Sequence, residues 1–437
     1  MFGRISKLIL IFFILFFSYS IAQNANKITL TLDKSLQIAY EKNKSLLDQK
    51  EKINYARYKI DEARSNFFPQ LSFQGNYTRL GVIPSMEIDI PGLFSRKMSI
   101  GFNDNYDLGL SLSQPIFTWG RIRNSYDISN LSYQASQESY RDTKQKIKFD
   151  VTKSLYQIIL FEELVKVGEE AKKNIEEHLK TVEARYKAGQ ASEFDLLRAK
   201  VQLANSDPPL IQAKNSLDLA LNGFKNLLGL DLATEIKLEG ELKYEPMEVD
   251  LPSTEKEALA NRIELKSIYL QKEISRKALN IAKAGNRPTL AGFLNYDYKN
   301  PFNSVQKWDD DWNFGFSINF PLFDGFATQS RINQSKSNIK DLEIVQRQIE
   351  DGILLETRQA ISNLNLAKEN ILSQKENVAQ AKKSLEIAKV QYTEGMITSL
   401  EEMDTQLALT IAQTNYLQAL ADWLVAKAEY EKAIGRE

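Results

Sequence analysis

The chain carries the same pattern of residues twice, and this repeat constrains the fold more than any other feature. The segment GLSLSQPIF at 109–117 matches GFSINFPLF at 315–323, and the same offset of 206 residues recurs to the end of each copy. The later matching pairs are Tyr186 with Tyr392, Gly189 with Gly395, and Gly229 with Gly435. Self-similarity at one fixed offset indicates two copies of one structural unit. We therefore predict a first repeat over 23–230, a second over 254–437, and a strand-containing linker over 231–253.

Each repeat is predicted to hold a helix, two strands joined by a loop, a long helix, a turn and a last helix. The predicted strands cover 71–79, 106–114, 290–298 and 312–320, the long helices 121–188 and 327–394, and the last helices 192–228 and 399–434. Pro69 matches Pro288 at a larger offset of 219 residues, so the first copy has 13 extra residues before Gly109. We expect these to lie in the loop at 80–104, because an insertion elsewhere would disturb the shared register.

The predicted strands alternate between apolar and polar residues. In 312–320 the apolar face consists of Trp312, Phe314, Phe316, Ile318 and Phe320, and small or polar residues lie between them. Such strands are typical of a barrel with lipid outside and water inside, although soluble antiparallel strands alternate too. Aromatic residues at the strand ends favour the membrane, because they prefer the headgroup region. We predict an aromatic girdle made of Phe117, Trp119 and Phe323 at one end and Trp312 toward the other.

Four strands cannot close a barrel by themselves. Every backbone N–H and C=O group in hydrocarbon needs a partner, and an open sheet edge has none. Two copies would give an interior filled with side chains and four a wider pore, whereas 12 strands from three copies surround an open lumen. We therefore predict a homotrimer whose shared barrel contacts outer-membrane lipid.

The long helices are predicted to form a wall that is one layer thick. Each is about 100 Å long if it is continuously helical at about 1.5 Å per residue. Apolar residues recur at spacings of three and four, as in coiled coils: Ile147, Val151, Leu155 and Ile158; Ala171, Ile175, Leu179, Val182 and Tyr186; Val378, Ala381, Leu385, Ala388 and Tyr392. A coiled-coil rod would explain these helices equally well, but it does not explain the strands at their ends.

The first 22 residues are predicted to be a secretory signal. Arg4 and Lys7 precede the apolar run Leu8 to Phe17, and Ser20 and Ala22 supply the small residues of a cleavage site. The apolar run is too short to cross a bilayer as a helix. We therefore expect an exported protein that lies in the outer membrane and extends into the periplasm.

The composition argues against most other classes of protein. Lysine plus arginine number 56 and aspartate plus glutamate 57, so no strong field attracts nucleic acid. There is no cysteine, and the single histidine, His178, lies among Glu and Lys residues, where we expect a solvated helix position. Thiolate sites, metal sites, cofactors and an enzymatic function are therefore not predicted. An exported coiled-coil adhesin or scaffold is the remaining alternative.

Several motifs resemble the TolC family of outer-membrane efflux proteins. They are the twofold repeat, the run QPIFTWGR at 114–121, the run FPLFDG at 320–325 and the turn after each long helix. The resemblance covers 28–436. It implies a mostly α, mixed fold: four transmembrane strands per subunit, and a trimer with a 12-strand β-barrel and a 12-helix α-barrel. It also implies a passive conduit of a tripartite efflux or type I secretion system, docked to a periplasmic adaptor (membrane fusion) protein and an inner-membrane transporter of RND or ABC type.

The turns after the long helices are predicted to form a periplasmic gate. Gly189 and Gly395 suit the left-handed end of a helix, and Ser192 with Asp195 and Thr398 with Glu401 have the spacing of capping boxes. Asp404 lies on the same helix face as Glu401, so three subunits would place six carboxylates around the tip. The family resemblance implies gate roles for Tyr392, Glu401, Asp404 and Asp195.

Two positions depart from a simple pattern. Where the best-studied family gate has an arginine, two residues after the glycine, this chain has Ile397. An arginine latch to Asp195 from that position is therefore impossible; Arg185 and Arg198 are the candidates to replace it, and we predict fewer ionic links. The run Asp207-Pro208-Pro209 predicts a kink in the last helix of the first repeat, or a stop and a restart capped by Asp207.

Overall fold

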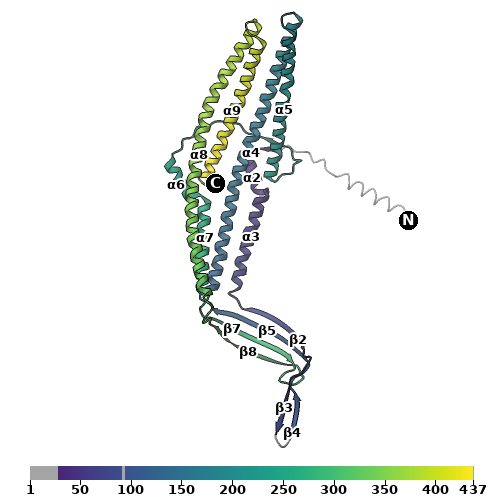
Figure 1. Cartoon of the computed structure of the whole chain (residues 1–437), viewed down its shortest axis with the longest axis vertical. Helices are drawn as coiled ribbons and strands as arrows, with labels where there is room; N and C mark the ends of the chain where they lie inside the picture. Colours follow the sequence, from purple (N-terminus) through teal and green to yellow (C-terminus); the bar gives the residue numbers. More distant parts are fainter. Residues whose placement is uncertain (1–27, 91–93, 437) are drawn as a thin grey trace, which may run out of the picture. The chain divides into compact units, whose positions relative to one another are not determined.

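The computed structural model describes residues 28–90 and 94–436, and the predicted signal over 1–22 lies outside them. The chain forms two compact units. Of the described residues, the hairpin unit contains 28–47, 143–261 and 354–436, and the sheet unit contains 48–90, 94–142 and 262–353. The units do not coincide with the sequence repeats, because each unit takes elements from both of them. Figure 1 labels the elements.

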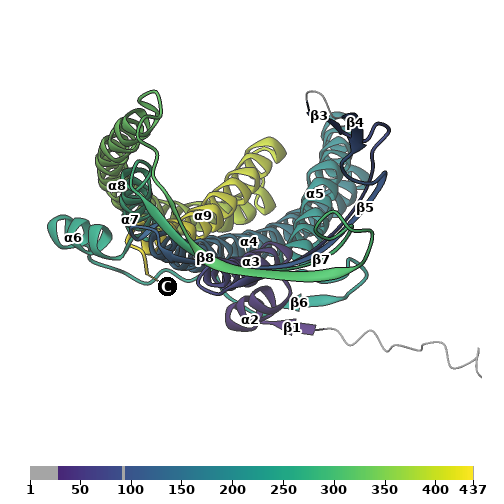
Figure 2. The same cartoon turned by 90° about the horizontal axis from the view of Figure 1, so that it is seen from below.

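The sheet unit is built on one antiparallel sheet of four strands. They are β2 (Gln70–Arg79), β5 (Asp104–Phe117), β7 (Thr289–Asn300) and β8 (Asp309–Asn319), in the order β2-β5-β7-β8. The two repeats therefore meet where β5 pairs with β7. Figure 2 shows the strands as one curved layer. Strands β2 and β8 each have a neighbour on one side only, so the sheet has two open edges.

The register of the sheet collects the apolar residues on one face. Leu71 lies opposite Leu112, which lies opposite Leu294, and Leu294 lies opposite Phe314. This face is exposed in the single chain, where Phe316 is 71% and Ile318 72% accessible. The polar face is linked across strands: Ser111 donates to Asn295 (2.7 Å), and Asn295 donates to Asn313 (3.1 Å).

Phe293 is the one large apolar residue on the polar face, and a glycine accommodates it. Phe293 lies opposite Gly315 in the register. A Cβ atom added at Gly315 would lie 2.8 Å from Cζ of the Phe293 ring. The sequence of β7 alternates only weakly because Phe293 is an apolar residue at a position of the polar face. The missing side chain of Gly315 leaves room for its ring.

The loop predicted over 80–104 contains a hairpin that the sequence analysis missed. Strand β3 (Ser85–Ile90) pairs with β4 (Phe94–Ser99) in a separate two-stranded sheet. The 13 extra residues of the first repeat therefore build an element of their own.

Each repeat enters its long helix through two successive residues with positive φ. These are Trp119 (51°) and Gly120 (75°) in the first repeat and Gly325 (63°) and Phe326 (65°) in the second. The two pairs match at the 206-residue offset. The glycine is the second residue of the pair in the first repeat and the first residue of the pair in the second repeat. The helices that follow are α4 (Arg121–Lys187) and α8 (Ala327–Thr393). The other helices of the sheet unit are α3 (Lys44–Ser65, from Asp48) and α7 (Ile263–Lys283).

In the hairpin unit, α4 turns back into α5 (Glu193–Leu228), and α8 turns back into α9 (Ser399–Ala433) (Figure 1). Five residues of the predicted apolar pattern on α4 are buried, namely Ile147, Val151, Leu155, Ile158 and Val182, whereas Tyr186 of the same pattern is exposed. Between α8 and α9 the core is made of alanine and larger residues, with Leu364, Ile371 and Trp423 at its centre. Small residues let the helices approach closely, which suits thin walls with little interior.

The linker over 231–253 covers the second hairpin. Leu242, Tyr244, Met247 and Val249 pack on the core between α8 and α9, and the Tyr244 ring meets Trp423 edge to face at 4.9 Å. The linker also carries β6 (Ile236–Leu238), which pairs in parallel with β1 (Ile28–Leu30), a strand that the sequence analysis did not predict.

The first helix of each repeat is broken in two, where one helix was expected. In the first repeat α2 (Leu32–Lys42) ends at Asn43 before α3, and in the second α6 (Leu251–Asn261) ends before Arg262 and α7. Asn43 and Arg262 match at the 219-residue offset and have nearly the same backbone angles, with φ −62° at both. Asn43 caps α3 through its side chain and donates to the carbonyl oxygen of Leu227 (2.7 Å).

Of the two outcomes expected at Asp207, a kink or a stop and restart, the stop and restart is not present. Helix α5 is continuous from Glu193 to Leu228 with Pro208 and Pro209 inside it. Asp207 does not cap a new helix; its carboxylate accepts a hydrogen bond from Lys172 of α4 (2.6 Å). The packing of α5 against α4 therefore holds the helix together across a site that its own sequence would interrupt.

Candidate functional site: the helix turns of the two hairpins

Both hairpins turn at a glycine with a left-handed backbone. Gly189 has φ 73° and Gly395 φ 75°, values that cost a residue with a Cβ atom free energy. In each turn the following residue donates its backbone N–H to a carbonyl five residues earlier: Gln190 to Arg185 (2.8 Å) and Met396 to Gln391 (2.8 Å). These bonds satisfy carbonyl groups that the helix end would otherwise leave free.

The two predicted capping boxes are confirmed. The Ser192 hydroxyl accepts from the backbone N–H of Asp195 (3.1 Å), and the Asp195 carboxylate accepts from the N–H of Ser192 (3.2 Å). Thr398 and Glu401 do the same for α9. The backbone N–H of Thr398 donates a hydrogen bond to the Glu401 carboxylate. This bond is stronger to the charged form than to the protonated form, so it holds the pKa of Glu401 below its ordinary value.

The expectation of a solvated His178 is wrong. Its side chain is 8% exposed, and both ring nitrogens contact the start of α9. Nε2 lies 2.9 Å from the Ser399 hydroxyl and Nδ1 lies 3.1 Å from a carboxylate oxygen of Glu402. His178 follows Ile175 by three residues and precedes Val182 by four, so it lies on the buried stripe of α4. That spacing was the signal in the sequence, and the surrounding Glu and Lys residues masked it.

Tyr392 is held between two side chains of α4. Its ring lies 5.2 Å from the His178 ring, and the Arg185 guanidinium lies over it at 4.6 Å. Arg185 also donates to the carbonyl oxygen of Thr393 (2.9 Å). Burial raises the pKa of Tyr392 above its ordinary value. In this chain the histidine and the arginine of α4 thus join the two hairpins next to the turns.

The predicted acidic gate residues do not converge within one chain. In the described part of the chain, Asp195 bonds only to Ser192 and Glu401 only to Thr398, so neither Arg185 nor Arg198 pairs with Asp195. Asp404 is exposed on α9. The polar residues that the structure does bring together are His178, Ser399 and Glu402. Ser399 and Glu402 were missed because they lie between and beside the capping residues.

The predicted girdle residues lie toward two ends of the sheet. Phe117 and Trp119 meet at 5.0 Å, and Trp119 donates to the carbonyl oxygen of Pro288 (2.7 Å). Phe323 contacts Phe326 at 5.5 Å. Trp312 lies opposite Tyr296 in the register, toward the other end. Near that end Tyr106, Tyr298 and Trp308 pack together.

Over residues 28–90 and 94–436, no helix has the length and apolar character needed to cross a bilayer. In the same residues no group of three His, Asp or Glu side chains is placed to hold a metal ion.

The family described as "Outer membrane efflux protein" matches residues 35–230 and 255–436. The chain belongs to this family. It is therefore an outer-membrane channel protein of efflux systems, a transport protein and not an enzyme, and it extends from the outer membrane into the periplasm. The family match has the same two parts as the internal repeat, separated by the linker.

Known proteins agree with this assignment. The chain is 24% identical over 389 residues to the "Probable outer membrane lipoprotein SilC" of Salmonella typhimurium, covering 85% of this chain and 80% of the relative. It is 21% identical over 393 residues to the "Outer membrane protein TolC" of Escherichia coli, covering 86% and 76%. The crystal structure of the CmeC outer membrane channel of Campylobacter jejuni superposes with a TM-score of 0.78 at 18% identity, covering 92% and 85%. This outer membrane efflux protein therefore has the mostly α fold with strands that its sequence predicts.

Proposed function

We propose that three copies of this outer membrane efflux protein form one passive exit channel with a 12-strand barrel and a 12-helix tunnel. The sheet of four strands with two open edges and one exposed apolar face carries this proposal. In hydrocarbon the unpaired N–H and C=O groups of β2 and β8 would each cost several kcal/mol. Joining β8 of one copy to β2 of the next satisfies these groups.

Three copies suit the inner face of the sheet. That face carries small and polar residues, such as Ser111, Asn295 and Ser317, which suit contact with water. An eight-strand barrel fills its interior with side chains, whereas 12 strands leave a lumen. The exposed rings of the apolar face then contact outer-membrane lipid, and Phe117, Trp119, Phe323 and Trp312 form the girdle.

We further propose that export is driven by partners. The channel docks through its helical hairpins to a periplasmic adaptor and an inner-membrane transporter of RND or ABC type. Relatives carry names as different as "Cation efflux system protein CusC" and "Toluene efflux pump outer membrane protein TtgI". We propose accordingly that the transporter selects the cargo and that this chain conducts what the transporter delivers.

The turns at Gly189 and Gly395 form the proposed periplasmic gate. Glu401 and Asp404 supply six carboxylates from three copies, with Asp195 beside them and Tyr392 holding the second hairpin to the first. A ring of carboxylates at a constriction attracts cations and repels anions. Ile397 cannot form the arginine latch of the best-studied family gate. We propose that the contacts of His178 and Arg185 with the second hairpin keep the gate closed instead.

Cysteine cross-linking across the sheet edges tests the trimer, because the natural chain has no cysteine. Ser72→Cys on β2 is combined with Asn313→Cys, Ser317→Cys or Asn319→Cys on β8. Strands β5 and β7 separate β2 from β8 within one chain, so a disulfide between them forms only between copies. We expect at least one pair to give covalent trimers on non-reducing gels after mild oxidation of membranes.

Ser72→Cys with Ser111→Cys is the matched control. These residues lie directly opposite each other within one chain, so their disulfide leaves the protein monomeric on the gel. A product that never exceeds a dimer in any edge pair would contradict closure by three copies. A product that stays monomeric in all of them would contradict the shared barrel itself.

A further inference from the structure

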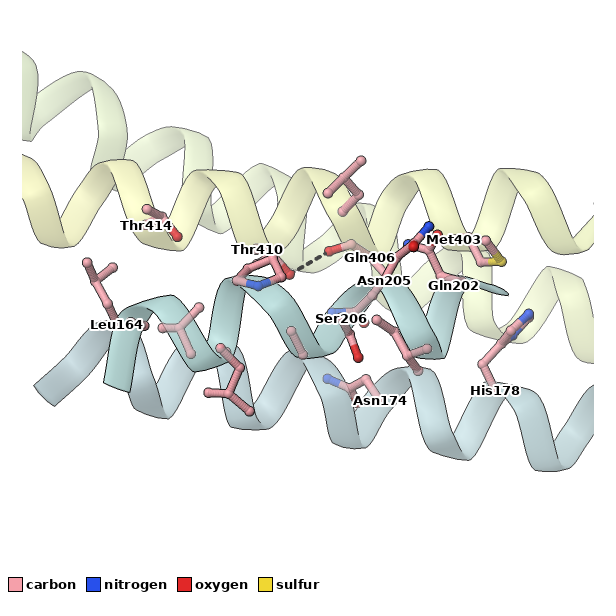
Figure 3. Close-up of a pocket in the computed structure, with 18 of the residues that line it drawn as sticks. Leu164, Asn174, His178, Gln202, Asn205, Ser206, Met403, Gln406, Thr410 and Thr414 are labelled. Carbon is pink, nitrogen blue, oxygen red and sulfur yellow. Dashed lines mark hydrogen bonds between the residues drawn. The ribbon is translucent and has the colours of Figure 1, made fainter. Parts of the chain in front are cut away.

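A cavity lies between the two helical hairpins, beside the His178 contact. Its volume is about 360 Å³, and it is lined by α4, α5 and α9, with one residue from α8. Figure 3 shows Leu164 toward one end of the lining and His178 with Met403 toward the other. All of the lining residues belong to the hairpin unit. Small-molecule sites in proteins usually have about 300–1,000 Å³, so the cavity has the size of a site for one small molecule.

The walls of the cavity are mainly apolar. Leu164, Val167 and Ile175 come from α4, Leu210 from α5 and Leu407 from α9. Gly168 of α4 permits the close approach of α5, because an added Cβ atom would lie 3.2 Å from Cδ1 of Leu210. Pro209 also lines the cavity. One proline of the α5 pair, which the channel function does not explain, thus belongs to the wall.

Two lining residues carry acceptor oxygens that have no hydrogen-bond partner in the described part of the chain. The side-chain oxygen Oε1 of Gln406 is buried and has no hydrogen-bond partner among the described residues. Glu402 gives one carboxylate oxygen, Oε2, to His178, which leaves Oε1 to a ligand. A buried acceptor without a partner raises the free energy of the empty site, and a donor that reaches it recovers this cost.

We propose that this cavity is a binding site for a small amphipathic molecule with an apolar body and an N–H or O–H donor. The apolar body fills the space between Leu164, Ile175 and Leu210, and the donor reaches Gln406 or Glu402. An ammonium ion and an alcohol share this chemistry. The charge of Glu402 favours the ammonium ion, and Lys389 at the same cavity opposes it. The site lies in the channel wall and does not depend on the proposed trimer.

Equilibrium dialysis of the full-length protein in lipid nanodiscs tests the site, with empty nanodiscs to subtract partition into lipid. The probes are phenethylamine, phenethyl alcohol and ethylbenzene, which share an apolar body and differ in the donor. We expect the amine and the alcohol to bind roughly tenfold more tightly than ethylbenzene. A tighter amine indicates Glu402 as the main acceptor, and equal binding of amine and alcohol indicates Gln406; both results support the site.

Two variants separate the site from general adsorption. Gln406→Leu removes one of the two acceptors; where amine and alcohol bind equally, it is expected to abolish their advantage over ethylbenzene, with Gln380→Leu on exposed α8 as the control. Ala171→Phe fills the cavity and is expected to abolish binding of all three probes, with Ala184→Phe on an exposed position of α4 as the control. Thermal melting checks that each variant is folded. Equal binding of the three probes to the natural protein, or unchanged binding to Ala171→Phe, overturns the proposal.

Discussion

At the scale of single residues, the contacts of His178 matter most for the proposed gate. One ring nitrogen meets a hydroxyl, the other a carboxylate, and the ring face meets Tyr392. All three partners belong to the second hairpin, whereas His178 belongs to the first. A single buried side chain therefore links the two hairpins close to their turns.

We expect His178→Ala to loosen the start of α9. The change leaves Ser399 and Glu402 without their partner, and unmade hydrogen bonds of buried groups cost about 1–3 kcal/mol. Hydrogen exchange of residues 392–402 should become faster, and the channel should conduct more in planar bilayers. Lys180→Ala, on an exposed position of the same helix, is the control. Unchanged exchange in His178→Ala would show that the contact does not hold the hairpins together.

Glu401 should make the start of α9 sensitive to acid. Its pKa is lower in the folded protein than in the unfolded chain, because the charged carboxylate accepts the N–H of Thr398. The cap therefore stabilises the helix above the unfolded pKa and is lost as pH falls through the folded pKa. Hydrogen exchange, corrected for its intrinsic pH dependence, should show fraying of residues 398–402 in that acidic range. Glu401→Gln should lack this transition, and a transition that persists in the variant would assign it to another group.

At the scale of elements, the turn glycines are needed for their backbone conformation and not because neighbouring atoms leave no room for a side chain. Apart from Gly395 itself and its two neighbours in the chain, no heavy atom of the described residues lies within 4 Å of a Cβ atom added at Gly395, yet its φ is 75°. The neighbouring cap and the 2.8 Å bond of Met396 fix the same turn. A substitution there therefore tests the backbone alone.

We expect Gly395→Ala to destabilise the second hairpin by roughly 1 kcal/mol, because a Cβ atom disfavours positive φ. Gly352→Ala is the matched control. Gly352 also has free space but lies within α8, so the substitution should stabilise that helix by about 0.5–1 kcal/mol. Thermal unfolding of both variants measures the difference. A shift of the same sign in both would refute this explanation of the turn.

At the scale of the whole molecule, the acidic gate exists only if copies assemble. Within one chain Glu401 serves a cap and Asp404 is exposed, so neither has a further role there. In the proposed trimer, three copies around one axis would bring six such carboxylates to the tip. We therefore expect the selectivity of the channel to depend on the assembly.

We expect Glu401→Gln with Asp404→Asn to reduce the preference for cations over anions by roughly threefold or more at low ionic strength, where charges are least screened. Glutamine is compatible with the capping box, so the helix start should persist. Reversal potentials in planar bilayers with a salt gradient measure the preference. Glu376→Gln with Glu386→Gln removes two carboxylates from α8 away from the turn as the control. An unchanged preference in the tip variant would exclude the ring.

The sequence determined the features that follow from local periodicity and from the repeat. Alternation in 312–320 predicted β8, the spacing around Val151 predicted the buried side of α4, and Ser192 and Thr398 predicted caps. Each of these depends on neighbours within a few residues, so one segment contains the information. The repeat also predicted the order of the elements, because a weak pattern that recurs at a fixed offset is easier to recognise than one that occurs once.

The tertiary structure decided the features that depend on segments far apart in the chain. Helix α5 continues through Pro208 and Pro209 because α4 packs against it, and His178 is buried because α9 lies over it. The pairing of β3 with β4 and of β1 with β6 likewise depends on which segments meet, although β3 alternates locally at Met86, Ile88 and Ile90 and a strand was expected in the linker that carries β6. Burial and hydrogen bonding between distant segments outweigh local propensity at these positions, so no single stretch of sequence reveals them.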